Sequence, residues 1–262
     1  MIPPGGGHPR DLADVSTPVA TNPAEVEQLA AGAGDLDEVD ARSSVCRACP
    51  RLVAWREQVA ATRRASFADQ EYWGRPVTGW GPQSASIAVV GLAPAAHGGN
   101  RTGRIFTGDR SGDWLFAALH RAGLARLPES ISADDGQELL DLRLTLPVRC
   151  APPDNRPTPA ERDACRPWLS AEWDVLRPTV RVVVVLGGYG WSALWPVLRA
   201  AGEAVPVPLP RFGHGTEVAL PGGPTVLGCY HVSQQNTFTG RLTQDMLDAV
   251  FGRALVLADL PR

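Results

Sequence analysis

The stretch IAVVGLAPAAHGGN, residues 87–100, begins with the apolar run Ile87–Gly91 and turns at once into a segment of small residues. A continuous apolar, β-branched run is typical of a strand covered on both faces. Three further runs share this character: Leu142–Val148, Val180–Leu186 and Thr225–Tyr230. Helical patterns accompany them at Asp113–Ala122, Pro159–Leu176, Gly190–Ala201 and Thr243 to about Leu255. We therefore predict an α/β fold, a three-layer α/β/α sandwich with a central, mostly parallel four-stranded sheet.

Each predicted strand is followed by a turn of unusual composition. The turns are Gly91–Asn100, Cys150–Asn155, Gly187–Gly190 and His231–Asn236. In an open α/β sheet, ligands bind outside the carboxyl ends of the strands. We therefore expect these turns to line one cleft. The Pro- and Gly-rich stretch Val205–Val218 resembles a hairpin and adds at most a short extra strand.

The composition excludes several chemistries. The chain of 262 residues has 25 positively charged side chains, and every one is arginine. Without lysine there is no P-loop, no pyridoxal Schiff base, and no side-chain amine that could attack a sugar aldehyde. The Gly187–Gly190 turn is too short and irregular for a dinucleotide fingerprint, so we expect no nucleotide cofactor.

The charge is unevenly distributed. The whole chain has a net charge of −3, which argues against a uniformly basic nucleic-acid-binding protein. Residues 1–43, however, hold eight acidic residues and two arginines, so the remainder carries a net charge of +3. That remainder is compatible with a polyanionic partner.

Residues 1–43 are rich in Gly, Pro, Ala and Asp and contain no aromatic residue. Such a segment buries too little apolar surface to offset its chain entropy. We predict a disordered acidic tail, with at most a short helix near Asn22–Ala31, and one folded domain over residues 44–262. The chain has no membrane-length apolar stretch and no signal-peptide pattern, which predicts a cytoplasmic protein. No apolar stripe is left over after the core helices are placed, which predicts a monomer.

Four cysteines have the spacing of a metal or cluster site. Cys46 and Cys49 form a C-x-x-C pair, and Cys150 and Cys165 form a wider pair around the Pro-rich segment after the second strand. Two residues between thiolates allow both to bind one centre. The pattern fits zinc and an iron–sulfur cluster equally well. Cys229, inside the last strand, is expected to be a buried apolar residue.

Three residues of the predicted cleft have both a structural and a chemical interpretation. Asp109 either caps the helix that follows it or points a carboxylate into the cleft. Phe106 is either a core residue or a platform for a planar ring. His231 ends a buried strand and opens a run of neutral hydrogen-bonding residues suited to phosphates or base edges. That run continues to Phe238 and Arg241, an apolar group and an arginine at an exposed tip suited to wedging between bases.

Two long motifs and the four cysteines resemble the type-5 uracil-DNA glycosylases. The motifs are GLAPA (91–95) with NRTGRIFTGDRSG (100–112), and HVSQQNTFTGR (231–241). The resemblance extends from about Ser44 to the C-terminus. It implies an enzyme that flips uracil out of DNA and hydrolyses the N-glycosidic bond to start base excision repair. It also implies that Cys46, Cys49, Cys150 and Cys165 bind a [4Fe–4S] cluster.

The resemblance also implies a role for each matching residue. Asp109 would position water and offset oxocarbenium charge, and His231 would donate a hydrogen bond to the departing base. Phe106 would stack on the flipped ring. Asn236 would hold the neighbouring phosphates together with Ser233, Gln234 and Gln235, and Asn155 would be a secondary site residue. The remaining DNA contacts would come from the tip residues Phe238 and Arg241.

Two positions depart from the pattern of related iron–sulfur glycosylases. Ala93 or Ala95 stands in the base-binding region where relatives have a polar residue, and Leu146 stands where they have a uracil-reading asparagine. A site rejects analogues strongly only when it holds polar groups that the wrong ligand leaves unpaired. We therefore predict broad specificity, with hypoxanthine and xanthine removed as well as uracil. The alternative is a non-catalytic iron–sulfur or zinc protein that binds nucleic acid through the same cleft.

Overall fold

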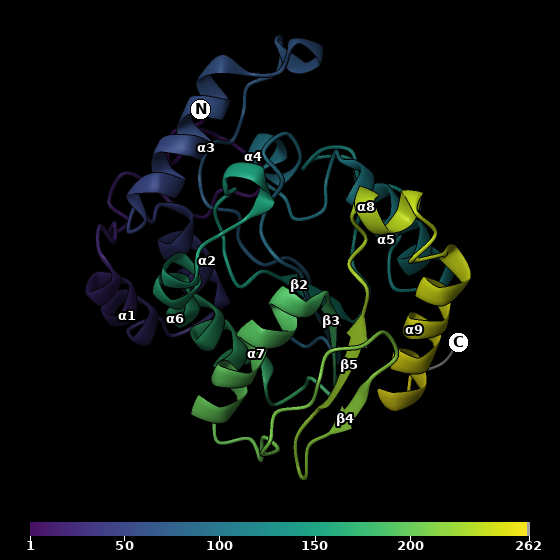
Figure 1. The fold of residues 1–262 in the computed structure, drawn as a ribbon. Coiled ribbons are helices and arrows are strands. Elements are labelled where there is room, and N and C mark those ends of the chain that lie inside the picture. Colours follow the sequence, from purple (N-terminus) through teal and green to yellow (C-terminus); the bar gives the residue numbers. More distant parts are fainter. Residues whose placement is uncertain (261–262) are drawn as a thin grey trace.

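A five-stranded sheet forms the centre of the molecule in the computed structural model, which describes residues 1–260. Its strand order is β2-β1-β3-β5-β4 (Figure 1). The four parallel strands are β1 (Ile87–Val90), β2 (Leu142–Thr145), β3 (Val182–Leu186) and β5 (Thr225–Cys229). These are the four predicted strands, each slightly shorter than its apolar run. The fifth, β4 (Glu217–Ala219), pairs antiparallel to β5 at the edge and comes from the end of the hairpin-like stretch.

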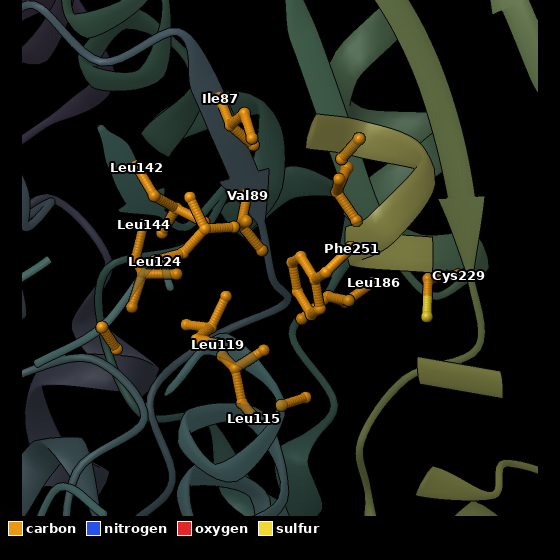
Figure 2. Packing of buried hydrophobic residues seen from close by; sticks show 14 of the residues in the cluster. Ile87, Val89, Leu115, Leu119, Leu124, Leu142, Leu144, Leu186, Cys229 and Phe251 are labelled. Carbon is orange, nitrogen blue, oxygen red and sulfur yellow. The ribbon is translucent and has the colours of Figure 1, made fainter. Parts of the chain in front are cut away.

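Helices cover both faces of the sheet, as predicted. One face packs against α5 (Arg110–Arg121) and α9 (Gln244–Leu257), and the other against α6 (Pro159–Leu176) and α7 (Gly188–Ala200). Figure 2 shows the first of these interfaces, where Leu115 and Leu119 of α5 and Phe251 of α9 meet strand residues such as Val89. Every residue of β1, β2 and β3 is buried, so none of these strands has a solvent-exposed face. β1 and β3 are apolar throughout, whereas β2 buries Arg143 and Thr145 together with its two leucines.

The predicted disordered tail at residues 1–43 is not what the structure shows. Two helices form there, α1 (Pro23–Ala31), which is the short helix expected near this position, and α2 (Leu36–Ser44). Both lie against α6, at the left of Figure 1. Val26, Ala30 and Val39 are buried around Trp168 of α6. The segment has no aromatic residue of its own, but it docks onto one supplied from much later in the chain.

Buried charges also hold this segment in place. Asp40 of α2 lies 3.1 Å from Arg143 of β2 and 3.3 Å from Arg149, both measured between side-chain N and O atoms. Glu172 of α6 pairs with the same two arginines at 2.6 and 2.7 Å. All four side chains are almost fully buried. Two carboxylates and two guanidinium groups therefore neutralise each other between the N-terminal helices and the sheet.

Replacing Asp40 with alanine is expected to lower the free energy of unfolding by about 3 kcal/mol, because it leaves two buried arginines sharing one carboxylate. Denaturant unfolding would measure this. Asp37→Ala, an exposed carboxylate on the same helix, is the matched control and is expected to change stability by less than about 0.5 kcal/mol. Equal effects of the two substitutions would indicate that α2 does not dock onto the sheet.

The remaining helices are short or lie at the periphery. They are α3 (Pro50–Thr62), α4 (Gly99–Thr102), α8 (Gln234–Phe238) and the 3₁₀ turns η1 (Ala65–Phe67) and η2 (Pro153–Asn155). None of these elements was predicted from the sequence. The longest, α3, follows directly from Cys49, its N-cap residue. Among residues 1–260, no helix combines the length and the apolar character needed to cross a membrane.

Candidate active site

A cavity of about 670 Å³ opens at the carboxyl ends of the parallel strands. Residues from four segments that follow β1, β2, β3 and β5 line it, as the sequence predicted. These segments lie within 92–111, 154–156, 187–189 and 230–241. The parallel arrangement of the strands is what brings together residues almost 150 positions apart in the chain.

Asp109 fulfils both of its predicted interpretations. It is the N-cap of α5, and its Oδ1 accepts a hydrogen bond from the Gly112 amide at 3.0 Å. It also lines the cavity. A methyl group on Gly98 would lie 1.9 Å from Oδ2, so only glycine at this position leaves room for the carboxylate. Burial raises the pKa of Asp109 above its ordinary value. The helix thus holds the carboxylate in a fixed orientation in a partly desolvated site.

Phe106 is held in a strained backbone conformation at the cavity wall. Its φ of 50° lies in the left-handed region, which bulky residues rarely adopt. The surrounding loop is fixed by buried hydrogen bonds, among them one of 2.7 Å between the Thr107 and Ser130 hydroxyls. A methyl group on Gly91 would lie 3.0 Å from Phe106 Cζ. The loop therefore places an aromatic ring over the end of β1, where it can contact a planar ligand.

His231 follows β5 and faces Phe106 across a ring-centroid distance of 6.2 Å. Burial lowers the pKa of its imidazole to about 4, so the ring is neutral at pH 7. No hydrogen bond to the ring is present within the part of the chain that the structure describes. A ring N–H is therefore available to a ligand in the cavity.

The structure gives Asn236 a positioning contact. Its Nδ2 donates to the His231 carbonyl oxygen at 2.8 Å, so this amide supports the turn that carries the histidine. Ser233, the N-cap of α8, and the exposed Gln234 and Gln235 also line the cavity. The first turn of α8 thus lies at the rim, where its polar groups can meet phosphates.

The two predicted tip residues lie in different surroundings. Phe238, at the end of α8, is 66% exposed and is not among the cavity-lining residues. The Arg110 guanidinium carbon lies 5.5 Å from its ring centroid. Arg241 does line the cavity, and its guanidinium carbon lies 4.5 Å from the Tyr230 ring centroid. The exposed aromatic ring and the rim arginine are thus both available to a bound polymer.

The secondary site residue and the two positions that depart from the pattern of related glycosylases also line the cavity. Asn155 is exposed on η2 with a φ of 54° and lines the cavity. Ala93 and Leu146 also line it, and neither has a side chain that can form a hydrogen bond. Tyr189 also lines the cavity, from the start of α7. The turn that carries it was expected at the cleft, but Tyr189 itself was not predicted as a site residue.

The four predicted ligand cysteines converge on one small apolar cavity. Cys46, Cys49, Cys150 and Cys165 all line it. They come from the end of α2, the start of α3, the turn after β2, and α6. Burial and the mutual repulsion of neighbouring thiolates raise the pKa of Cys49 to about 12, so ionised thiolates need a cationic centre here. Cys229 lies apart from them, buried in β5, as expected.

The cysteine cavity offers thiolate donors only from these four residues. Within residues 1–260, no three His, Cys, Asp or Glu side chains are placed to bind a single metal ion. Four thiolates are a ligand set that both zinc and an iron–sulfur cluster accept.

Comparison with known proteins agrees with this geometry. The family model of the uracil DNA glycosylase superfamily matches residues 78–254. A type-5 uracil-DNA glycosylase of Mycobacterium tuberculosis is 57% identical over 259 residues, which cover 99% of this chain and 95% of that protein. The chain belongs to the type-5 uracil-DNA glycosylases. The Thermus thermophilus type-5 uracil-DNA glycosylase is 50% identical over 83% of this chain and 95% of its own length.

Membership of the type-5 uracil-DNA glycosylases confirms the predicted family and makes the chain a DNA-repair hydrolase of the glycosidase type. It sets aside the alternative of a non-catalytic binding protein. The similarity to the mycobacterial relative also reaches into residues 1–43, which the resemblance did not include. A type-4 uracil-DNA glycosylase of Thermotoga maritima is 30% identical over 60% of the chain.

Proposed function

We propose that this type-5 uracil-DNA glycosylase flips a deaminated base into the cavity and hydrolyses its N-glycosidic bond with Asp109 and His231. The observation that carries the proposal is that a desolvated carboxylate and a neutral imidazole line the same cavity, with an aromatic ring beside the imidazole. Phe106 stacks on the flipped base and fixes its plane. The cost of flipping is a few kcal/mol and is smallest for a mispaired base, which favours lesions over normal pairs.

The two groups act on opposite charges. As the bond from the sugar C1′ to the base nitrogen breaks, the sugar becomes positive and the base carries the bonding electrons. The Asp109 carboxylate stabilises the positive sugar and orients the water that adds to C1′. The neutral His231 donates a hydrogen bond to the base oxygen where negative charge accumulates. A neutral donor suits this role, because burial disfavours the charged form of the imidazole.

Unpaired arginines at the rim support the binding of DNA. Arg110, Arg156 and Arg241 line the cavity, and none forms an ion pair with a residue in the described part of the chain. Many other arginines are paired with a carboxylate, for example Arg253 with Glu217 at 2.8 Å. Because guanidinium groups bind phosphate bidentately, the three rim arginines and the start of α8 hold the DNA backbone. Phe238 then fills the stack beside the flipped nucleotide.

The apolar wall supports broad base specificity. Ala93 and Leu146 leave no buried polar group unpaired when a base other than uracil enters. We therefore expect hypoxanthine and xanthine to be removed as well. The absence of lysine supports a monofunctional reaction, since no side-chain amine can attack C1′. The N-terminal amine lies 3.9 Å from Glu71 and is not among the residues lining the cavity.

End-labelled oligonucleotides that contain one uracil, hypoxanthine or xanthine test these statements together. The expected result is strand scission of all three, in each case only after alkali. Release of uracil alone would contradict the broad specificity. Scission without alkali, or a protein–DNA adduct trapped by borohydride, would contradict the monofunctional mechanism.

A [4Fe–4S] cluster is the cofactor that the four converging cysteines fit. Cys46, Cys49, Cys150 and Cys165 would bind it through their thiolates. Base hydrolysis requires no electron transfer, so the cluster would act by joining α2, α3, the turn after β2, and α6 at one point. Ala93 contacts the Leu52–Cys150 cluster of apolar residues and also lines the active-site cavity, so this point lies directly behind the base pocket.

The pH dependence of the reaction follows from the two pKa shifts. Asp109 acts as a carboxylate and burial raises its pKa, so the single-turnover rate is expected to rise with pH through a midpoint above the ordinary range of aspartate. His231 acts as the neutral form and has a pKa of about 4, so it causes no change near pH 6.5. Single-turnover kinetics between about pH 5 and 8 would measure the profile. If the rate fell as the pH rose through about 6.5, and His231→Gln abolished that fall, the imidazolium would be the active form.

A further inference from the structure

Arg56 of α3 is fully buried and bonded to the cysteine site. Its side chain is 1% exposed. Nη1 donates to Cys150 Sγ at 2.8 Å, and Nη2 donates to the Cys46 carbonyl oxygen at 3.0 Å. Nε is buried and has no hydrogen-bond partner. No carboxylate among residues 1–260 forms an ion pair with this guanidinium.

The other buried arginines have different interaction partners. Four of the other five are ion-paired, namely Arg75 with Asp11, Arg104 with Asp135, and both Arg143 and Arg149 with Asp40 and Glu172. The fifth, Arg101, donates from all three nitrogens to neutral oxygens and lies in the field of Asp109. Arg56 alone in this set directs its charge at a cysteine sulfur.

The charges around the cysteine site do not neutralise Arg56. Glu161 is an acid whose charge acts on Cys49, and it is already bonded to Arg51 through two hydrogen bonds of 2.7 and 2.8 Å. The Asp40 and Glu172 carboxylates are bonded to Arg143 and Arg149. An isolated buried charge costs several kcal/mol unless an opposite charge lies beside it. The protein without a cofactor therefore contains an uncompensated buried cation.

We propose that Arg56 is the counter-ion of the iron–sulfur cluster and directs a charge-assisted hydrogen bond at its Cys150 thiolate. This inference rests on the cofactor proposed above. A [4Fe–4S]²⁺ core with four thiolates has a net charge of about −2, so it supplies the anion that the surrounding residues do not. Arg56 is then a positioning residue for the cofactor, and it makes the empty cavity unfavourable and the filled one favourable.

Arg56→Met tests the inference, because it removes the charge and keeps the length of the side chain. Cluster content is followed by iron and sulfide analysis and by visible absorbance, and retention by the rate of bleaching in a chelator. Bleaching is expected to be about a hundredfold faster than in the wild type. Arg56→Lys, which keeps the charge, is expected to retain most of the cluster. Arg51→Met, on the same helix but paired with Glu161, is the matched control and is expected to bleach at the wild-type rate.

The stability of the cluster-free protein shows whether Arg56 is a counter-ion or only a packing residue. After removal of the cluster, Arg56→Met is expected to unfold at higher denaturant concentration than the wild type, because the uncompensated charge is gone. With the cluster bound, the wild type is expected to unfold at the higher denaturant concentration. The same loss of stability in both forms, or bleaching of Arg56→Lys as fast as Arg56→Met, would overturn the proposal. A wild-type protein that binds no iron would instead refute the cofactor, and a wild-type cluster unaffected by Arg56→Met would refute only the role of Arg56.

Discussion

Asp109→Asn is expected to lower the single-turnover rate of uracil excision by about 10²- to 10⁴-fold, with the affinity for uracil-containing DNA almost unchanged. The amide cannot stabilise a positive sugar and orients water poorly. Asparagine caps helices as well as aspartate does, so the hydrogen bond to the Gly112 amide and the start of α5 should survive. The substitution therefore separates the chemical role of the carboxylate from its structural role.

Two further substitutions serve as controls for Asp109→Asn. Asp113→Asn removes another carboxylate, in the first turn of the same helix, and is expected to leave the rate within about twofold of the wild type, because Asp113 is exposed and is not among the residues that line the cavity. Asp109→Ala removes both carboxylate and cap, and should add a loss of stability of about 1 kcal/mol. A rate for Asp109→Asn close to that of the wild type would show that the carboxylate is only a cap.

His231→Ala is expected to lower the rate of excision by about 10²- to 10³-fold, again with little effect on DNA binding. The loss arises because the departing base no longer receives a hydrogen bond as it becomes negative. The Asn236 amide bonds to the backbone carbonyl of residue 231, so the turn should keep its shape in the variant. Single-turnover kinetics and a binding titration with the same oligonucleotide would measure the two effects separately.

His231→Gln is the informative companion, because glutamine can donate a hydrogen bond but cannot become a cation near pH 6. It is expected to recover part of the lost rate. If the histidine acted as a charged acid, glutamine would be as inactive as alanine. A parallel loss of DNA affinity in both variants would assign His231 to binding instead of to the reaction.

The sequence predicted the sheet because the information is local. β1 and β3 are continuous apolar runs, and every residue in them is buried in the structure. The other two parallel strands are less uniform, since β2 also buries Arg143 and Thr145, and β5 begins with the half-buried Thr225. The position of the cavity also followed from the sequence, since parallel strands bring their carboxyl ends to one edge. Asp109 was found there because it starts a helix, and His231 because it follows a strand. Phe106 lies in the loop before α5 and was found through the motif that surrounds it. For Asp109, the two competing interpretations proved compatible, because a helix N-cap can also face a cavity.

The N-terminal segment could not be predicted from its own composition. Residues 1–43 lack aromatic residues, but α1 and α2 bury their few apolar side chains against Trp168, more than 120 residues away. Asp40 appeared to belong to a solvated acidic tail, and it is in fact neutralised by Arg143 and Arg149. Contacts between segments so distant in sequence produce no hydrophobic periodicity in either segment. The sequence pattern alone therefore does not reveal them.

By itself, the sequence determined the α/β class, the loops that carry the chemistry and, through the absence of lysine, a reaction without a side-chain Schiff base. Tertiary structure alone decided the electrostatic state of the site. The pKa of His231 falls to about 4, and that of Asp109 rises, because packing removes water from both. The orientation of Arg56 toward Cys150 was decided in the same way. Desolvation and charge pairing depend on which distant residues surround a group, and the order of residues along the chain does not contain that information locally.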